Sequence, residues 1–594
     1  MSRFLITTAD ERTWKFDRPV LFLGEWCRHY DRRHVWAALD ATVAEPYGLG
    51  RDEKRRDLAR TEAVSRELLV ELAAALNLVH GTDHGPRYWQ IVLGHWLRRY
   101  VDTIFNRHAT LEHALARHDI DRTVVIDAPA SALVRNDSLA FIYGCNDDQW
   151  NHALYARILD SFEPTGISRE TLSAEVSTGP AAGAVASPPL LKRAAGRIGR
   201  SVLAAACRAD DAFIMRSYLP RGTEVALQIS LRQCPQFWQS PAVGVTAASP
   251  ERRQLLRLPL DGRSGFDRCV RDLLPGLLPT CYLEGFGGLV RQCRALPWPS
   301  RPRFIFTSNN FDTDEVFKVW CAGQVEQGTP YFAGQHGNNY GTHFYAGNSQ
   351  WPERSATDAF ISWGWSDPAT NVVPAFNFKA PNPQPMPHDP GGGLLLVEEG
   401  VNHRLTPWDS YYEFGTYQEQ QFRFVEALPL EIRRALMVRI HGEHVIHRWC
   451  EPRRWAERHP AVRLDTGQVN IQALIAQSRL VVYSYESTGV LENLTGNVPT
   501  LCFWPYGLTH LLPEARPHYS QLVEAGIIAE SPEQAAAFVS RVWGNVRGWW
   551  GSDRVQRART AFCDQYARPE AHPVTTMRRL LTEQARRAAA PATA

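Results

Sequence analysis

Short apolar segments alternate with helical patterns along most of this 594-residue chain. The segments end in polar or glycine-rich residues, and their Val, Ile, Leu and Phe content is typical of strands buried on both faces. Strands that alternate with helices predict an α/β fold with parallel sheets. The expected strands are Phe4–Thr7, Val20–Leu23, Val124–Ile126, Leu139–Tyr143, Phe304–Thr307, Tyr331–Ala333, Ala359–Ser362, Leu394–Val397, Leu436–Ile440, Leu480–Tyr483 and Thr500–Phe503. The expected helices are Arg56–His80, Asp314–Gln324, Thr416–Glu426 and Ser487–Leu494.

A segment rich in proline and glycine, Pro381–Gly393, interrupts this alternation and predicts a linker between two domains. Residues 1–380 form the expected first domain, which is too large for one plain nucleotide fold and therefore carries helical insertions. Residues 394–575 have the size of one doubly wound sheet, and 576–594 form an expected tail. Ser177–Pro189 is expected to be a flexible loop. Two Rossmann-like domains that face each other would leave a ligand cleft at the carboxyl ends of their strands.

The composition argues against several classes of protein. The 65 basic and 63 acidic residues give a net charge of +2, which does not favour a nucleic-acid partner. The 11 cysteines include no C-x-x-C pair, which argues against a disulfide framework or a zinc ribbon and favours reduced thiols in the cytoplasm. No secretion signal opens the chain, and no apolar run reaches the ~18 residues that a membrane span needs. We therefore expect a cytoplasmic protein, with any membrane association peripheral.

The segment Leu480–Trp504 predicts an anion site. An apolar strand is followed by Ser484, Ser487 and Thr488 at the start of a helix, where free N–H groups and the helix dipole favour a phosphate. Glu492, inside that helix, suits the hydroxyl groups of a ribose. The alternative interpretation is an ordinary Ser/Thr cap on a Rossmann-like helix.

A second candidate is the loop after the strand Tyr331–Ala333, which carries Gln335, His336 and Gly337. A histidine beside glycines at a strand end is placed to approach a ligand closely. His343 is a further candidate in the same loop. The alternative is a hydrogen-bonded turn without chemistry.

The segment Leu436–Trp449 places Arg439 on a strand that looks buried, so the guanidinium requires an anionic partner. A diphosphate, a carboxylate on a sugar or a neighbouring acidic residue would each serve. The segment also holds His441, His444 and His447. Their i, i+3, i+6 spacing spreads them around a helix, which favours surface or supporting roles over a zinc site.

Acidic residues follow the first two strands, and we take Asp10 and Glu25 as candidates for a general base toward an acceptor hydroxyl. Capping and salt bridging are the alternative for each. Asp312-Thr313-Asp314 has the letters of a metal-binding motif and leaves metal-dependent chemistry as a minority interpretation. We expect neither a metal ion nor a cofactor.

The motifs together resemble a transferase family found in O-antigen and other surface-polysaccharide loci, from about Phe4 to Phe562. The stretches that carry the resemblance are TADERTW, VLFLGEWC, RYWQIVLGHW, QHGNNYG, FISWGW, VRIHG, YSYESTGVLENLTGNVPTLCFW and RGWW. The C-terminal half also resembles the donor domain of GT-B glycosyltransferases, through Ser487–Glu492 and Pro499. More distantly, Gln335–Gly337 is similar to short His motifs of capsule and teichoic-acid polymer transferases that use cytidine nucleotides.

The resemblance implies a cytoplasmic GT-B glycosyltransferase that moves a sugar from a nucleotide-activated donor, with a CMP-sugar slightly favoured, to a glycan or lipid-linked glycan acceptor. His336, Asp10 and Glu25 are its expected catalytic residues. The expected donor-binding residues are Gln335, Gly337, Arg439, Ser484, Ser487, Thr488 and Glu492. Retaining GT-B enzymes space two glutamates more widely than Glu486 and Glu492, so we expect inversion without a metal. A sugar-nucleotide epimerase and a non-catalytic glycan-assembly scaffold are the alternatives.

Overall fold

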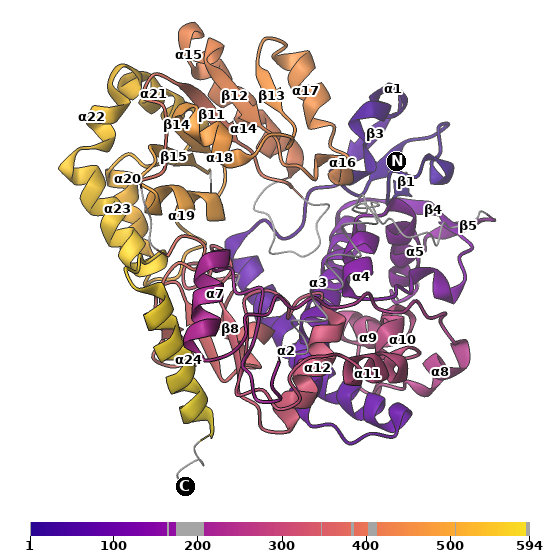
Figure 1. Cartoon of the computed structure of the whole chain (residues 1–594). Coiled ribbons are helices and arrows are strands. Elements are labelled where there is room, and N and C mark those ends of the chain that lie inside the picture. The colour runs from indigo at the N-terminus through magenta and orange to yellow at the C-terminus, as the bar shows by residue number, and fades with distance from the viewer. Residues whose placement is uncertain are drawn as a thin grey trace, which may run out of the picture. The chain divides into compact units, whose positions relative to one another are not determined.

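Figure 1 shows the computed structural model, which describes residues 2–162, 166–173, 207–345, 347–381, 385–401, 413–504 and 506–589. The chain divides into two compact units. The first comprises Met1–Met215, Arg232–Tyr331 and Asn402–Ser410, and the second comprises Arg216–Leu231, Phe332–Val401 and Tyr411–Ala594. The expected linker 381–393 does not coincide with a border between these units, since residues 332–401 cluster with the C-terminal part. The loop expected at Ser177–Pro189 lies outside the described residues.

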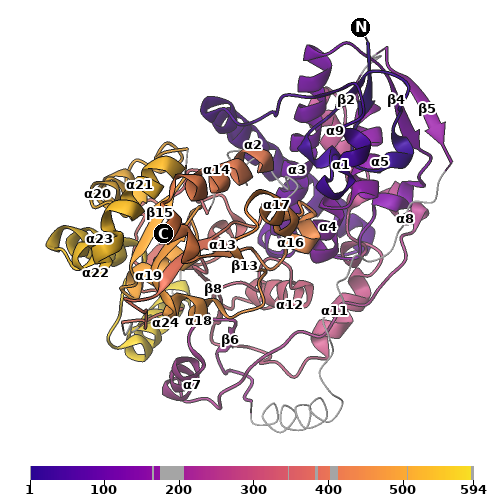
Figure 2. The same cartoon turned by 90° about the horizontal axis from the view of Figure 1, so that it is seen from above.

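The first unit contains a five-stranded parallel sheet in the order β3-β2-β1-β4-β5. Its strands are β1 (Arg3–Ile6), β2 (Val20–Phe22), β3 (Ala41–Val43), β4 (Ile120–Ile126) and β5 (Ser168–Leu172). This is the strand order of a Rossmann fold, with the reversal beside β1. Helix α5 (Asp148–Leu159) packs on β4 (Figure 2).

A second sheet has the order β10-β9-β8-β7-β6. Strands β6 (Phe213–Met215) and β7 (Ile305–Thr307) belong to the first unit. Strands β8 (Tyr331–Gly334), β9 (Ala359–Ser362) and β10 (Val372–Pro374) lie almost wholly in the second. The pairs β6–β7, β8–β9 and β9–β10 are parallel.

The second unit contains a six-stranded parallel sheet in the order β13-β12-β11-β14-β15-β16, which repeats the Rossmann order. Its strands are β11 (Gly393–Val397), β12 (Leu436–Arg439), β13 (Arg463–Asp465), β14 (Ser478–Tyr483), β15 (Thr500–Phe503) and β16 (Ile528–Ala529). Leu396, Val438, Val482 and Phe503 are fully buried in one core beneath helices on the face of this sheet. The predicted α/β class with parallel, Rossmann-like sheets is confirmed.

Helices complete both units. Those of the first are α1 (Arg33–Trp36), α2 (Arg51–His80), α3 (Pro86–Arg117), α4 (Ser138–Cys145), α5, α8 (Pro250–Leu255), α9 (Gly265–Asp272), α10 (Leu274–Leu277), α11 (Phe286–Arg294) and α12 (Glu315–Glu326). Those of the second are α7 (Arg221–Ser230), α13 (Pro352–Ser355), α14 (Phe414–Ala427), α15 (Leu430–Arg434), α16 (His444–His447), α17 (Glu451–Arg458), α18 (Ile471–Ala476), α19 (Thr488–Thr495), α20 (Arg516–Glu524), α21 (Pro532–Val542), α22 (Val546–Trp550), α23 (Asp553–Tyr566) and α24 (Pro573–Ala589). Among the described residues, no helix combines the length and the apolar character that crossing a bilayer requires.

Two sequence-based assignments are wrong. Leu139–Tyr143, expected as a strand, lies in α4, where the Asp137 side chain accepts a hydrogen bond from the Ala140 N–H and caps the helix. The expected tail is helical as far as Ala589, because α24 packs on α7 (Figure 1) and buries Met577, Leu580 and Leu581. That i, i+3, i+4 spacing is the apolar stripe of an amphipathic helix.

Leu396 tests the core of the second unit. It is completely buried in β11, so Leu396→Ala should lower the free energy of unfolding by about 2–5 kcal/mol through lost apolar burial and a residual cavity. The measurement is urea denaturation followed by circular dichroism. Leu430→Ala is the matched control, because this leucine is 56% exposed and its loss should cost less than ~0.5 kcal/mol. Equal costs for the two substitutions would contradict the assigned core.

Candidate functional site

The loop after β8 and the start of α19 meet in the second unit. The Asn338 backbone N–H donates to Thr488 Oγ1 at 3.2 Å, and the Asn338 side-chain amide donates to the Glu486 carbonyl at 2.6 Å. A Cβ atom at Gly337 would stand 3.0 Å from Thr488 Oγ1, so glycine permits this close approach. Two motifs about 150 residues apart in sequence therefore form one site.

The first turn of α19 combines a cap with an anion-binding position. Ser487 is the N-cap residue, and its hydroxyl oxygen accepts a hydrogen bond from the Gly489 N–H at 3.0 Å. Ser487 therefore caps α19, as the alternative interpretation of this segment expects. The helix dipole still points its positive end at the loop after β8, which favours a phosphate there. Donor binding by Ser487 and Thr488 stays a prediction.

The strand order of the second unit reverses between β11 and β14, and ligands of open α/β sheets bind at the carboxyl ends of strands at such a point. Ser484 follows β14 there. Its hydroxyl lies 2.7 Å from the Tyr417 hydroxyl and donates to the Val397 carbonyl at 3.3 Å. Ser484 is thus buried in a hydrogen-bond network at this edge of the sheet, and donor binding by it stays a prediction.

Glu398 follows β11 at the same edge of the sheet and is almost completely buried. Burial raises its pKa to about 8, although the Trp455 indole N–H hydrogen-bonds to the carboxylate. Burial also raises the pKa of nearby Glu451 to about 7. Because Glu398 is mostly protonated at neutral pH, it adds little negative charge beside a prospective phosphate position.

His336 follows β8 and is half-buried. Its Nδ1 lies 3.3 Å from the Tyr340 hydroxyl, which donates its proton to Glu353 Oε1 at 2.7 Å. Since Tyr340 donates to Glu353, its oxygen accepts from Nδ1–H of the imidazole. When the ring is neutral, this arrangement leaves the lone pair on Nε2, the form that a general base requires.

Gln335 serves the structure of the loop. Its side-chain oxygen accepts hydrogen bonds from the Trp363 N–H and from the Trp365 indole, both at 2.9 Å. Its side-chain amide donates to the Gly337 carbonyl at 2.8 Å. Gln335 is 1% exposed, so these contacts use both ends of the amide to hold the loop in shape. Contact with a donor stays a prediction for Gln335 and Gly337.

The two remaining donor-site candidates have protein partners. Glu492 lies 3.1 Å from the Lys379 ammonium, and both side chains are partly exposed. Arg439 forms an ion pair with Asp465 and donates to the Val469 carbonyl at 2.7 Å. The anionic partner that the sequence requires for Arg439 is thus available within the sheet, and a donor contact is not needed to explain its burial.

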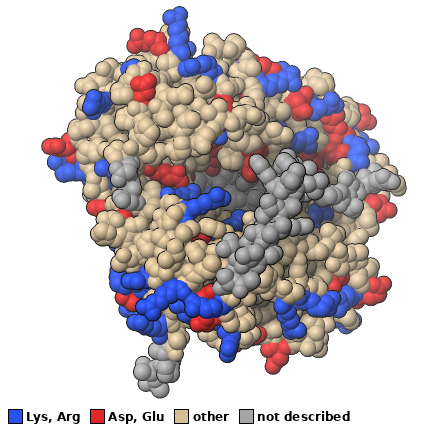
Figure 3. All heavy atoms as spheres, viewed as in Figure 1, with Lys and Arg blue, Asp and Glu red and all other residues tan. Residues whose placement is uncertain are grey.

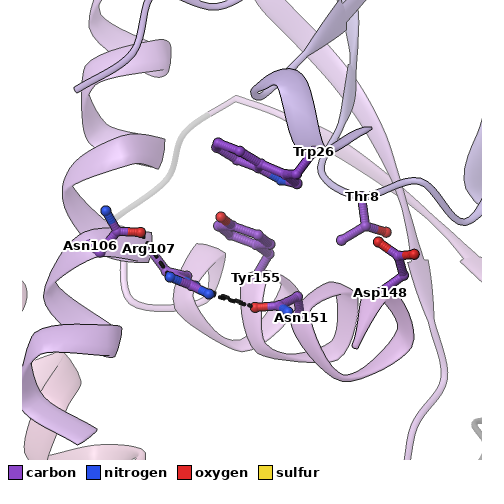
Figure 4. A pocket seen from close by; sticks show the side chains of 7 residues that line it. All are labelled: Thr8, Trp26, Asn106, Arg107, Asp148, Asn151 and Tyr155. Carbon is purple, nitrogen blue, oxygen red and sulfur yellow. Dashed lines mark hydrogen bonds between the residues drawn. The ribbon is translucent and has the colours of Figure 1, made fainter. Parts of the chain in front are cut away.

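The first unit has a pocket at the carboxyl ends of its Rossmann strands (Figure 4). Trp26 and Tyr155 face one another across it, with Thr8 and Asp148 on one side and Arg107 on the other. Arg107 donates to Asn151 Oδ1 at 3.2 Å, and Asp148 Oδ1 accepts from the Ala9 N–H at 3.4 Å. The cavity has a volume of about 10 Å³, roughly the room for one water molecule, so a sugar ring would enter it only if these side chains moved apart.

Asp10 and Glu25, the expected bases, are close in sequence to residues of this pocket, but they stand at two different 3-10 helices. Asp10 caps a short 3-10 helix, Glu11–Thr13, and forms an ion pair with Arg12. Burial alone would raise the pKa of Asp10, but the hydrogen bonds and the charge of Arg12, together with the charge of His152, outweigh burial and lower it. Glu25 begins the 3-10 helix Glu25–Cys27, directly before the pocket residue Trp26. Catalysis by either residue stays a prediction.

The aspartates of Asp312-Thr313-Asp314 have separate roles. Asp312 accepts a hydrogen bond from Arg99 at 2.9 Å, whereas Asp314 caps α12 through the Phe317 N–H. Among the described residues, one group of three side chains has its ligand atoms close enough for a metal ion, and it consists of His343, Glu486 and His510. Within the described part of the chain, His441, His444 and His447 do not form such a group, and their surface or supporting roles stay a prediction.

Several residues of these sites were not predicted from sequence. Asp148 and Tyr155 lie on α5 and Lys379 follows β10, and no motif surrounds them. His510 lies in the loop after β15 and has no ligand-like spacing to His343 or Glu486. A pattern at the start of α5, Asn146-Asp147-Asp148, signals a helix cap and offers the one local clue to Asp148.

Glu398 gives the site a testable pH dependence. The folded protein keeps this carboxyl protonated up to its pKa of about 8, whereas the unfolded chain ionises it near the ordinary value of 4.5. Unfolding therefore releases a proton between these values, and the free energy of unfolding falls as pH rises, by up to about 1.4 kcal/mol per pH unit.

Glu398→Gln removes this term, so the variant should gain stability relative to the wild type as pH rises from about 5 to 8. Urea denaturation across that range gives the comparison. Glu431→Gln, on the exposed start of α15, is the control. A constant difference between Glu398→Gln and wild type at every pH would contradict the buried, protonated carboxyl.

Several solved structures resemble this chain at low identity. A spinosyn rhamnosyltransferase, SpnG, is 14% identical over 50% of this chain and 76% of its own, with a TM-score of 0.29. A protein from Listeria monocytogenes described as a UDP-N-acetylglucosamine 2-epimerase is 16% identical over 62% of this chain and 95% of its own, with a TM-score of 0.34. WaaG, a glycosyltransferase of lipopolysaccharide biosynthesis, is 10% identical over 50% of this chain and 95% of its own, with a TM-score of 0.28. The TM-scores are low, so we base no argument on these likenesses.

No curated protein matches the chain. A family of transferases, in contrast, matches residues 3–581 and thus both compact units. The match includes both Rossmann-like sheets, the loop of His336 and the start of α19. The chain therefore belongs to the LIC12162 family of transferases.

Proposed function

We propose that the protein is a GT-B-type glycosyltransferase that moves a sugar from a nucleotide-activated donor to an acceptor of surface-polysaccharide or O-antigen synthesis. The contact of the His336 loop with the N-terminal turn of α19 supports this function most directly. His336, the proposed base, lies two residues before Asn338, and a helix N-terminus at the carboxyl edge of Rossmann-like strands is suited to a phosphate. The family match supports the transferase class.

In this proposal the second unit holds the donor. The α19 N-terminus and the hydroxyls of Ser484, Ser487 and Thr488 face the phosphates, and Glu492 faces the ribose. Lys379, paired with Glu492 at 3.1 Å, adds a cation near the leaving group. A cytidine nucleotide, as in a CMP-sugar, is the favoured donor.

The first unit binds the acceptor, a glycan or a lipid-linked glycan. A sugar ring would bind beside Trp26 and Tyr155 once these side chains move apart, because the cavity between them has a volume of about 10 Å³, and the carboxylate of Asp148 would accept its hydroxyl groups. Basic and acidic side chains are interspersed on the face in Figure 3, so we propose no nucleic-acid partner. The protein would work in the cytoplasm, peripheral to the membrane when its acceptor is lipid-linked.

The proposed reaction is a direct displacement with inversion. The acceptor oxygen forms a bond to the anomeric carbon as the bond from that carbon to the phosphate oxygen breaks. His336 Nε2 takes the acceptor proton, Tyr340 and Glu353 hold the imidazole, and the electron pair leaves with the nucleotide phosphate. Asp10 and Glu25 are the alternative bases. The transfer itself requires no metal ion in this scheme.

A panel of nucleotides tests the donor. Cytidine, uridine and guanosine mono- and diphosphates are compared by the rise in melting temperature, with the largest rise expected for a cytidine nucleotide. Glu492→Ala should reduce this rise because the ribose loses its carboxylate. Glu524→Ala, on the exposed end of α20, should leave it unchanged. An unchanged rise in Glu492→Ala would remove Glu492 from the site.

Assays of the best donor then separate the classes. A transferase slowly hydrolyses its donor without acceptor, an epimerase interconverts free sugar nucleotides, and a scaffold does neither. Interconversion, or the absence of both reactions, would overturn the proposed transfer.

His336 tests the chemical step. His336→Ala should lower turnover ~100-fold or more while the fold survives, since general acid–base groups contribute on that scale. His336→Gln keeps a hydrogen-bond donor but cannot accept the proton, so it should be equally slow. In the wild type, activity should rise with pH through the imidazole pKa, because the base must be neutral.

Initial transfer rates are measured for the wild type and both variants at pH values below and above the imidazole pKa. His572→Ala, an exposed histidine in a loop, is the matched control and should retain the wild-type rate. Near-normal rates in His336→Ala would move the search to Asp10 and Glu25. Activity that falls with rising pH would instead favour a protonated imidazole beside the leaving phosphate.

A further inference from the structure

Three buried side chains from three segments meet beneath the start of α19 in the second unit. His343 comes from the loop after β8, Glu486 from the turn before α19 and His510 from the loop after β15. Their side chains are 7%, 6% and 1% exposed, respectively. None of them is required by the proposed transfer.

The backbone holds the two histidines side by side. His343 and Leu511 form an antiparallel bridge, flanked by hydrogen bonds from the Phe344 N–H to the His510 carbonyl at 2.9 Å and from the Leu512 N–H to the Thr342 carbonyl at 2.7 Å. The carbonyl of Glu486 is held by Asn338. Backbone hydrogen bonds therefore fix the three segments that carry the cluster.

The ligand atoms converge on one point. Nε2 of His343 and Nε2 of His510 lie 2.8 Å and 2.5 Å from the same oxygen, Oε2 of Glu486, and all three atoms are within 4.8 Å of one another. The imidazole rings meet at 78°, so they are edge to face and not stacked. Tyr506 packs its ring at 86° against His510, with centroids 4.9 Å apart, and restricts the orientation of that imidazole. Two nitrogen donors and one carboxylate oxygen are a set that zinc sites use.

The hydrogen bonding of the cluster is incomplete. Glu486 is hydrogen-bonded by the His510 ring and by the Tyr519 hydroxyl. Within the described residues, in contrast, no group meets hydrogen-bond geometry at His343 Nε2, although this nitrogen lies 2.8 Å from Glu486 Oε2. Buried polar atoms are normally satisfied, so His343 Nε2, directed at a carboxylate oxygen and a second imidazole, indicates an absent partner. A cation among the three ligands would satisfy it.

We propose that His343, Glu486 and His510 bind one zinc ion. Three protein ligands leave one tetrahedral position for water. The ion ties the loop of His343 and the loop of His510 to the turn that begins α19, and it contacts no substrate. It is compatible with a metal-free transfer step, departs from the sequence-based expectation of no metal ion, and does not depend on the proposed function.

Elemental analysis tests this site directly. The full chain is produced with a tag that lacks histidine, in medium supplemented with zinc, and is passed through gel filtration. The wild type should carry roughly one zinc ion per chain, and His510→Ala and Glu486→Gln should bind zinc at least ~10-fold more weakly. His444→Gln, a histidine of α16 outside the cluster, is the matched control and should keep its zinc.

A measurement on the wild type covers the case in which the variants do not fold. A chelator removes the metal, and Co²⁺ is then added to the stripped chain. Binding should produce visible d–d absorption of a Co²⁺ ion with nitrogen and oxygen ligands and should raise the melting temperature. Nucleotide binding is not needed for either readout, so failure of the proposed transfer leaves the test valid.

The proposal is overturned by any of three results. The wild type contains less than ~0.1 zinc ion per chain and gives no Co²⁺ spectrum; the folded His510→Ala variant keeps the full zinc content; or His444→Gln loses zinc as His510→Ala does. The first result would leave the three side chains as a protein-only ion cluster.

Discussion

The hydrogen bonds of Asn338 are the contacts on which the candidate site depends. They join the loop after β8 to Thr488 and to the carbonyl of Glu486 at the start of α19. A helix N-terminus offers unsatisfied N–H groups and a positive dipole end, but it becomes a specific site only when other groups are held against it. Asn338 supplies this connection, and His336 lies two residues before it.

Two buried polar side chains near this point, Gln335 and Glu398, are accommodated from within the unit. Gln335 uses its whole amide to connect Trp363, Trp365 and Gly337, which leaves its neighbour His336 in a defined backbone position. Glu398 avoids the cost of a buried charge by remaining protonated. Glu398 therefore adds little negative charge at the end of β11.

The fold was largely predictable because buried parallel strands appear in the sequence as short apolar runs and amphipathic helices appear as apolar residues at helical spacing. The exceptions have local causes. The segment of α4 reads as a strand by composition, but the Asp137 cap selects a helix. Residues 576–594 were expected to form a tail, but α24 packs against α7, which lies more than 300 residues earlier in the chain. Such pairings have no signature near the segment itself.

The sequence by itself determined the α/β class, the strand ends and the residue types at them, because these depend on periodicity and on local turn chemistry. Tertiary structure decided which strand ends meet. It paired Arg439 with Asp465, placed Asn338 on Thr488 and brought His510 to His343 and Glu486. Contacts between residues far apart in the chain depend on strand order and loop path, and neither is encoded in the spacing of the residues that touch.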